Sequence, residues 1–318
     1  MLGRVAPVGP SVESVDITPC VTDADYEQWR RVRIAVIPYE RTQSLAEMRE
    51  GDSPERLLLL ARVDGTVAGS GLSDRAESAN SGSVIPRVLP EFRRQGIGTV
   101  LLHRLADHVA ALGLPTLRAS VDDEASSLFA EHFGFTEVNR EVEQTYTVTA
   151  TPDLSPMPEG LEVITAQERP GVWEECFDRF GRESLADFAV DTPLEVTLDR
   201  WTRVWLGDPM FLALHDGEVV GCAGLNLDAD DPARAENALT AVRRDWRGSG
   251  IAVHLKQRVL TWAAEHGIAE VYTWTQDGNA AMRALNTSLG YATTRTGIQV
   301  VRALPLSDRP VPNGDADD

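Results

Sequence analysis

Two short stretches of this 318-residue chain combine arginine and glycine in a way that can bind an anion. They are residues 93–98 (RRQGIG) and 247–252 (RGSGIA), and each lies between a strand-like run and an amphipathic helical pattern. Glycine lets the backbone curl with its N–H groups pointing inward, and the helix start adds unpaired N–H groups and a positive dipole end. Several donors facing adjacent oxygens suit a diphosphate, and this chemistry requires no metal.

Other glycine-rich motifs fit these stretches less well. A triphosphate P-loop needs Lys and then Ser or Thr after its last glycine, and neither stretch has them. A dinucleotide fingerprint needs a third Gly or Ala where this chain has Leu101 and Val253. For either stretch alone, an ordinary strand-to-helix turn is the alternative.

The elements that must position the two stretches follow one order in each half of the chain. A strand leads in at residues 83–88 or 238–242, and a helix with one apolar stripe leads out. A further strand and a last helix follow, at 116–121 and 124–132 in the first half and at 271–275 and 279–288 in the second. Two strand-like runs close the first half before residue 148.

Landmarks recur at a nearly constant offset, which indicates a duplicated fold. The hairpin turns are Asp64-Gly65 and Asp216-Gly217, and the glycines that end the last helices are Gly134 and Gly290. Each copy reads β-α-α-β-β-β-α-β-α-β-β, an α/β (α+β) arrangement of a mostly antiparallel mixed sheet flanked by helices. The expected division is a flexible tail at 1–14, a domain at 15–150, a linker at 151–160, a domain at 161–304 and a disordered tail at 305–318.

Composition excludes several classes of partner. The chain has 30 Lys plus Arg against 49 Asp plus Glu, a net charge of −19, and such a surface repels nucleic acid. No apolar run is long enough to span a bilayer and no signal peptide is visible, so we expect a cytoplasmic protein without a membrane partner. The three cysteines and six histidines have no metal-ligand spacing, and no metal site is expected.

The pattern Arg-x-x-Gly-x-(Gly or Ala) resembles the coenzyme A pyrophosphate loop of the GNAT superfamily of N-acetyltransferases. The element order also looks like the GNAT fold, so nearly the whole chain resembles a tandem GNAT protein. The resemblance implies that acetyl-CoA is the cofactor and that a small-molecule amine attacks it directly in a ternary complex. The implied cofactor contacts are Val88, Arg93, Arg94, Gln95, Gly96, Ile97, Gly98 and Thr99, and in the second copy Thr240, Val242, Arg247, Gly248, Ser249, Gly250, Ile251, Ala252 and Asn279.

The resemblance also implies where the proton donors and acceptors lie. Many family members have a tyrosine acid four residues before the last glycine, where this chain has Ala130 and Asn286. Asn286 can hydrogen-bond the thioester or a water but cannot donate a proton at neutral pH. Tyr291 and Tyr272 are either substitute acids or core residues, and Glu236 is either a base acting through a water or a solvated strand-end charge.

Asn279 is placed to cap the last helix of the second copy, and the first copy has Asp123 at this position. A carboxylate faces the cofactor's phosphates less favourably than an amide does. We therefore predict that the second copy is catalytic and that the first binds coenzyme A or serves as a structural partner. A non-catalytic acyl-CoA binding or sensing protein is the alternative function. The identity of the amine, and the choice between monomer and homodimer, stay open.

Overall fold

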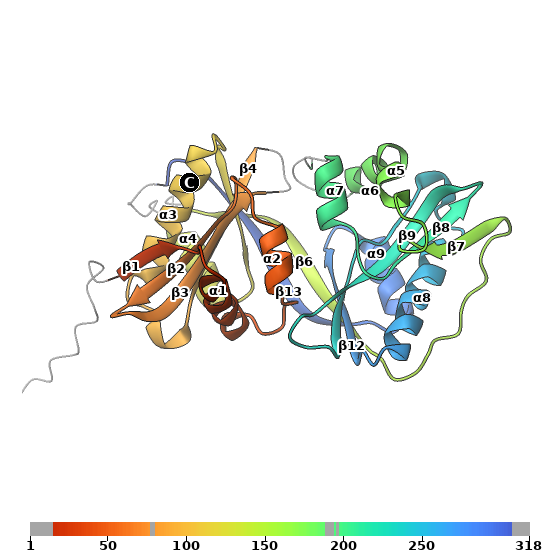
Figure 1. Cartoon of the computed structure of the whole chain (residues 1–318), viewed down its shortest axis with the longest axis horizontal. Helices are drawn as coiled ribbons and strands as arrows, with labels where there is room; N and C mark the ends of the chain where they lie inside the picture. The colour runs from red at the N-terminus through yellow and green to blue at the C-terminus, as the bar shows by residue number, and fades with distance from the viewer. Residues whose placement is uncertain (1–14, 77–79, 188–193, 195–196, 307–318) are drawn as a thin grey trace, which may run out of the picture.

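The computed structural model describes residues 15–76, 80–187, 194 and 197–306. The expected tail at 1–14 and most of the one at 305–318 lie outside these residues. Figure 1 shows two halves side by side, with strands of both halves meeting between them.

The N-terminal half begins with an edge strand and two helices and continues into a hairpin. Its elements are β1 (Val15–Pro19), α1 (Asp23–Val36), α2 (Leu45–Glu50), β2 (Leu57–Val63), β3 (Thr66–Arg75), β4 (Ser81–Val88), α3 (Ile97–Ala111), β5 (Thr116–Val121), α4 (Glu124–His132) and β6 (Thr136–Thr147). The two strand-like runs expected before residue 148 are wrong, because this segment forms the single strand β6.

The C-terminal half repeats this order after the irregular segment at 151–160. Its elements are β7 (Leu161–Thr165), α5 (Val172–Glu175), a π-helical turn (Phe177–Gly181), α6 (Arg182–Ala186), α7 (Leu198–Val204), β8 (Met210–His215), β9 (Glu218–Leu227), β10 (Arg234–Asn237), β11 (Ala241–Val242), α8 (Ile251–Glu265), β12 (Glu270–Gln276), α9 (Ala280–Ser288) and β13 (Ala292–Ala303).

One sheet of 13 strands runs through both halves, because the halves exchange their last strands. Its main path is β1-β2-β3-β4-β5-β13-β6-β12-β10-β9-β8-β7, and β11 pairs with β9 beside this path. β13 from the C-terminal half pairs with β5, and β6 from the N-terminal half lies between β13 and β12. Each half therefore completes the sheet of the other, which ties them together by backbone hydrogen bonds.

Helices cover both faces of this sheet. In the N-terminal half, α3 and α4 bury an apolar cluster against one face, while α1 and α2 bury a second cluster against the other. In the C-terminal half, α8 takes the place of α3, and the α5–α7 segment covers the opposite face. The predicted helix stripes account for this packing, since Leu101, Leu105, Leu255 and Val259 are fully buried.

In each half, one parallel strand pair opens part-way along its length. β4 pairs with β5 only from Ser81 to Ser83, and β10 pairs with β12 only from Arg234 to Glu236. The strand expected at 238–242 is correct only at its end, because the chain leaves the ladder after Asn237 and rejoins β9 at Ala241. The opening exposes strand edges that have no β-ladder partner.

The hairpin turns at Asp64-Gly65 and Asp216-Gly217 are confirmed, with φ near +50° and +79° in both. Positive φ at both central positions is the type I′ geometry that matches the twist of the flanking strands. No helix in the described part of the chain is long and apolar enough to cross a membrane.

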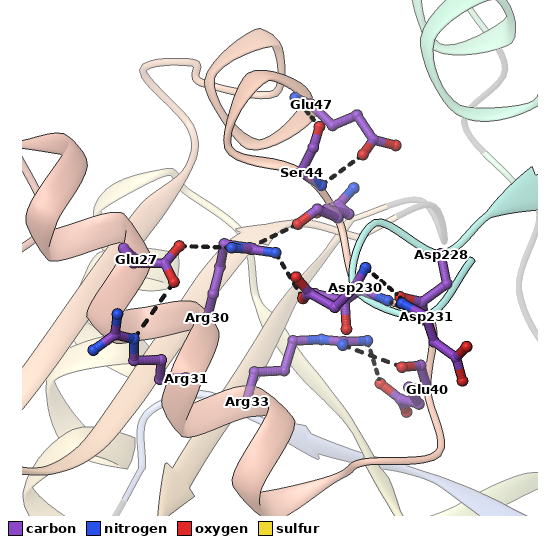
Figure 2. A network of polar contacts seen from close by, with 12 residues as sticks. Glu27, Arg30, Arg31, Arg33, Glu40, Ser44, Glu47, Asp228, Asp230 and Asp231 are labelled. Carbon is purple, nitrogen blue, oxygen red and sulfur yellow. Dashed lines mark hydrogen bonds and ion pairs between the residues drawn. The ribbon is translucent and has the colours of Figure 1, made fainter. Parts of the chain in front are cut away.

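A polar network joins the two halves, as Figure 2 shows. The Arg30 guanidinium pairs with Glu27 on its own helix and, at 2.7 Å, with Asp230 of the other half. The Thr42 N–H donates to the Asp228 carboxylate at 2.9 Å. The segment that follows α1 is therefore held against the C-terminal half.

Candidate active site

The second glycine turn presents unpaired backbone donors at the start of α8. Gly248 and Gly250 have φ of +75° and +91°, and a Cβ atom at either would meet no atom within 4 Å. The first hydrogen bond of the helix runs from His254 N–H to the Gly250 carbonyl. Among the described residues, the N–H groups from Gly248 to Val253 have no acceptor, so they can face an anion.

The first glycine turn has nearly the same backbone. Gly96 has φ of +82°, and Arg94 adopts φ of +62° where the second turn has Gly248. Arg93 Nε donates to the Val88 carbonyl at 3.2 Å, just as Arg247 Nε donates to the Val242 carbonyl at 3.0 Å. In both halves, the Nε atom of this arginine ties the turn to the end of the preceding strand.

The surroundings of the two turns differ. In the N-terminal half, a Cβ on Gly98 would lie 3.4 Å from the Phe129 ring of α4, so an aromatic side chain already packs against this turn. In the C-terminal half, Asp187 at the end of α6 forms ion pairs with both Arg244 and Arg247. An anion at the second turn therefore competes with a carboxylate for these guanidinium groups.

Among the described residues, some buried side-chain atoms without a hydrogen-bond partner belong to segments that border the opening of β10 from β12. They are Nδ2 of Asn237 at the end of β10, Oγ1 of Thr240 between β10 and β11, and Oδ1 of Asn286 on α9. Buried polar groups are nearly always satisfied, so these atoms are candidate hydrogen-bond partners for a ligand. The residues of the second turn and this opening fit coenzyme A, whose diphosphate and amide-bearing arm need N–H donors and further hydrogen-bond partners.

The residues that begin the last helices cap them as expected. The Asn279 side chain accepts from Met282 N–H at 3.2 Å, and Asp123 accepts from Ser126 N–H at 2.6 Å. Burial opposes ionisation of Asp123, but hydrogen bonds from Ser126 and the charge of Arg93 hold its pKa below the usual value. The N-terminal half thus has a negative charge where the C-terminal half has a neutral amide.

Glu236 lies on the last rung of the β10–β12 ladder, opposite Tyr272. Strand alternation directs its side chain away from α8, because Ala235 and Asn237 face that helix. Burial raises the pKa of Glu236 to about 7, with Glu40 adding to the effect and Arg41 opposing it. A carboxyl group with this pKa can accept a proton near neutral pH.

The N-terminal half contributes to the same face of the sheet. The Arg41 N–H donates to the Tyr272 hydroxyl at 2.6 Å, and Arg234 donates to the Tyr39 carbonyl. Next to these contacts, a pocket of about 320 Å³ is lined by Pro38, Tyr39, Thr145, Arg234, Glu270, Thr294 and Arg295. The pocket combines guanidinium, carboxylate, hydroxyl and aromatic groups from both halves, which suits a polar small molecule.

Asn286 lies on α9 and is fully buried. Its Nδ2 donates to Gln144 Oε1 of the exchanged strand β6 at 3.0 Å and to Thr275 at 3.5 Å. The amide at the expected acid position therefore belongs to a network that links the two halves. Gln144 carried no signal in the sequence, because only the exchanged strand brings it to α9.

Tyr291 is buried beside α8, and burial raises the pKa of its hydroxyl. Its Oη donates to Asn237 Oδ1 at 2.8 Å, and the same oxygen accepts from Lys256 Nζ at 2.9 Å. Neither Asn237 nor Lys256 was expected from the sequence to belong to the site. The available signal was the position of Lys256, which directly follows Leu255 of the apolar stripe.

The structure thus separates the expected catalytic residues into two groups. Tyr291 and Asn286 lie on the face covered by α8 and α9, whereas Glu236 and Tyr272 point to the opposite face. The two groups lie on either side of the β10–β12 opening. Candidate residues therefore border the opening on both faces of the sheet.

Comparisons with known proteins agree with this geometry. The profile of the Acetyltransferase (GNAT) family matches residues 22–135 and 173–291. A mycothiol acetyltransferase from Kocuria rhizophila is 25% identical over 78% of this chain and 85% of its own, and one from Thermobispora bispora is 28% identical over 84% and 89%.

Solved structures share the tandem fold. A GCN5-related N-acetyltransferase from Sphaerobacter thermophilus superposes with a TM-score of 0.70 at 22% identity, over 92% of this chain and 97% of its own. A tandem GNAT protein from the clavulanic acid biosynthesis pathway has a TM-score of 0.73 at 18% identity, over 92% and 100%. The chain is an acetyltransferase-type enzyme with two GNAT copies, and it belongs to the Acetyltransferase (GNAT) family.

Proposed function

We propose that the protein is an acetyl-CoA-dependent N-acetyltransferase that acts on a small-molecule amine, with the C-terminal half as the catalytic copy. One observation supports the C-terminal half. Glu236, whose pKa is about 7, lies where β10 and β12 separate, and the second glycine turn follows it along the chain. The N-terminal half has Ser83 on the corresponding rung and so lacks a base there. The expected compartment is the cytoplasm.

Bound acetyl-CoA supplies the acetyl group as a thioester. The N–H groups from Gly248 to Val253 bind the diphosphate, and the free edge of the chain between Asn237 and Val242 pairs with the arm. Asn279 caps α9 and offers its amide beside the same opening. These contacts orient the thioester, which is the main contribution of a site without a covalent enzyme intermediate.

The acceptor amine reaches the opening from the face of the sheet where residues of both halves line the 320 Å³ pocket. Glu236 takes a proton from the amine, directly or through a water, so that the nitrogen lone pair can attack. The leaving sulfur needs one proton in return. Because Asn286 has none to give at neutral pH, that proton returns from the Glu236 carboxyl or from water.

The experiment is thiol release from acetyl-CoA in a panel of amines, including amines related to mycothiol, the compound for which similar proteins are named. We expect one thiol per acetylated amine for at least one acceptor. A non-catalytic acyl-CoA sensor is the second candidate, favoured by the buried Asn286 at the acid position. Calorimetric binding of acetyl-CoA without turnover of any amine would support the sensor and contradict catalysis.

A further inference from the structure

Three polar side chains, Asn237, Lys256 and Tyr291, are buried together beneath the β10–β12 opening. They are 8%, 1% and 3% exposed. Lys256 Nζ and Tyr291 Oη both donate to Asn237 Oδ1, at 2.9 and 2.8 Å, and Lys256 Nζ lies 5.0 Å from the centre of the Tyr291 ring. We refer to these residues as the buried trio.

The trio fixes the orientation of one amide. Because two donors converge on Asn237 Oδ1, rotating the amide by half a turn would set its NH₂ group against them. Asn237 Nδ2 is then left buried, and no described residue accepts from it. An unsatisfied buried donor is costly, so this arrangement is one that a bound acceptor atom would complete.

The position of Asn237 identifies that acceptor. Asn237 directly follows Glu236, the last residue of β10 that pairs with β12, and its side chain lies on the α8 face. The unsatisfied donor is therefore at the point where the strands separate. Under the proposed function, this point is where the acyl thioester lies.

The N-terminal half shows that the fold does not need polar groups here. Aligning the last rungs of the two ladders, the starts of α3 and α8, and the glycines after the last helices matches the trio with Val84, Leu102 and Phe135. These residues are 0%, 2% and 7% exposed and belong to the apolar core. Replacing buried ionic groups by apolar ones of similar size is often neutral or stabilising, so the trio is not explained by stability.

We propose that Asn237 is a catalytic residue that donates from Nδ2 to the carbonyl oxygen of the acyl thioester, and that Lys256 and Tyr291 are positioning residues for its amide. The inference rests on the proposed function. As the amine nitrogen bonds to the carbonyl carbon, the C=O electron pair moves to the oxygen that Nδ2 faces. That pair reforms the carbonyl when the C–S bond breaks and its electrons leave with the sulfur. A fixed donor at this oxygen costs no reorganisation during the reaction.

The main test replaces the trio by its counterparts. Asn237→Val removes the donor, and the triple variant N237V/K256L/Y291F installs the apolar set that the N-terminal half already packs. We expect Asn237→Val to lower kcat by about 100- to 1,000-fold, with a much smaller rise of about two- to tenfold in KM for acetyl-CoA. We expect the triple variant to fold, to melt no lower than the wild type, and to be equally inactive.

A second readout does not depend on turnover. Calorimetry compares the affinity for acetyl-CoA with that for coenzyme A, which lacks the carbonyl oxygen. Asn237→Val should weaken acetyl-CoA binding by about two- to tenfold and leave coenzyme A binding unchanged. Lys256→Leu and Tyr291→Phe should each lower kcat less than Asn237→Val, because the donor is still present but less well oriented.

The outcomes separate the two proposals. If Asn237→Val keeps the wild-type kcat and the wild-type difference in affinity between acetyl-CoA and coenzyme A, the proposed role of Asn237 is wrong and the proposed function stands. If the wild type binds acetyl-CoA but acetylates no amine, the contact of Asn237 with the carbonyl oxygen is still tested. Asn237→Val then weakens binding of acetyl-CoA and not of coenzyme A if the contact exists, and changes neither if it does not. If the wild type does not bind acetyl-CoA, both proposals fail. Unfolding of the triple variant would assign the trio to the fold and contradict the inference.

Discussion

In both halves, an arginine donates to the carbonyl at the end of a strand, and the next helix begins at a glycine with positive φ. The chemistry next to this shared backbone differs. The last rung of the ladder holds Glu236 in the C-terminal half and Ser83 in the N-terminal half. The duplicated fold therefore preserves the turn in both copies, while a carboxyl group with a pKa of about 7 lies on the last rung in the second.

The N-terminal half also contributes residues to the surroundings of the β10–β12 opening. It supplies β6, whose Gln144 bonds Asn286, and the segment after α1, whose Arg41 bonds Tyr272. Both contacts reach the surroundings of the β10–β12 opening in the other half. The N-terminal copy, which has Ser83 in place of the carboxyl group, thus contributes to the geometry of its partner.

The largest effect should come from blocking the second glycine turn, with the same change in the first turn as the comparison. Gly250→Glu adds a carboxylate among the anion-binding N–H groups at a φ of +91°, which side chains rarely adopt, and should abolish acetylation. Gly96→Glu makes the same change in the first half and should leave much of the activity. Rates of thiol release measure both. The reverse result would move catalysis to the N-terminal half and undo the comparison.

Removing the base should have the next largest effect. Glu236→Gln keeps the shape of the side chain and should lower kcat by about 10²- to 10⁴-fold, the usual contribution of a general base. The wild-type kcat/KM should rise with pH through about 7 as the carboxyl group loses its proton, and the variant should lack this limb. Ser83→Ala is the matched control in the first half. A pH profile unchanged by Glu236→Gln would contradict the role of Glu236.

Stability should depend on pH in opposite directions on the two sides of neutrality. The pKa of Glu236 is raised from 4.5 to about 7, so its stabilising contribution is present below 4.5 and is lost as pH rises to 7. The pKa of Lys256 is lowered by burial from 10.5 to about 7, so stability is lost as pH falls from 10.5 to 7. Each slope approaches about 1.4 kcal/mol per pH unit.

Denaturant unfolding across this pH range checks both slopes. Compared with the wild type, Glu236→Gln should flatten the dependence between pH 4.5 and 7, and Lys256→Leu should flatten it between 7 and 10.5. Ser83 and Leu102, which hold the corresponding positions in the N-terminal half, do not titrate in this range and add to neither slope. If both variants followed the wild-type curve, these two groups would have ordinary pKa values.

The smallest effect should come from the carboxylate beside the second turn. Asp187→Asn removes the charge that pairs with Arg244 and Arg247, and frees these guanidinium groups for the diphosphate. An exposed ion pair of this kind contributes little, so coenzyme A should bind about two- to fivefold more tightly. Calorimetry at low and high salt measures the change. Weaker binding would show that Asp187 supports the turn and does not compete with the ligand.

Local patterns in the sequence were enough for much of the fold. The hairpins at Asp64-Gly65 and Asp216-Gly217, the helix stripes and the cap at Asn279 each depend on neighbours within a few residues, and each is confirmed. From the sequence, Asp23 or Asp25 is expected to cap α1, and this expectation is wrong. Thr22 caps the helix and Asp25 returns the bond in a capping box. Thr and Asp are both residue types that cap helices, and only the backbone geometry separates them.

The site was predictable only in part. The turns were found because their chemistry is contained in six consecutive residues. Lys256 and Asn237 were not found, because a cation in an apolar stripe becomes informative only when its partner is known. Glu236 was placed near the correct strand, but the sequence did not indicate its pKa. Burial and Glu40 raise this pKa and Arg41 lowers it, and the last two residues come from the other half.

The sequence alone determined the duplication, the two glycine turns and the family resemblance, because each depends on short motifs that can be recognised without knowing their neighbours in space. Only the tertiary structure decided that β6 and β13 change places and that segments of the N-terminal half border the candidate site of the other. Strand exchange leaves the periodicity of each strand unchanged, because β6 shows the same alternation whichever sheet it joins. The strands that β6 and β13 pair with are chosen by contacts between residues far apart in the sequence.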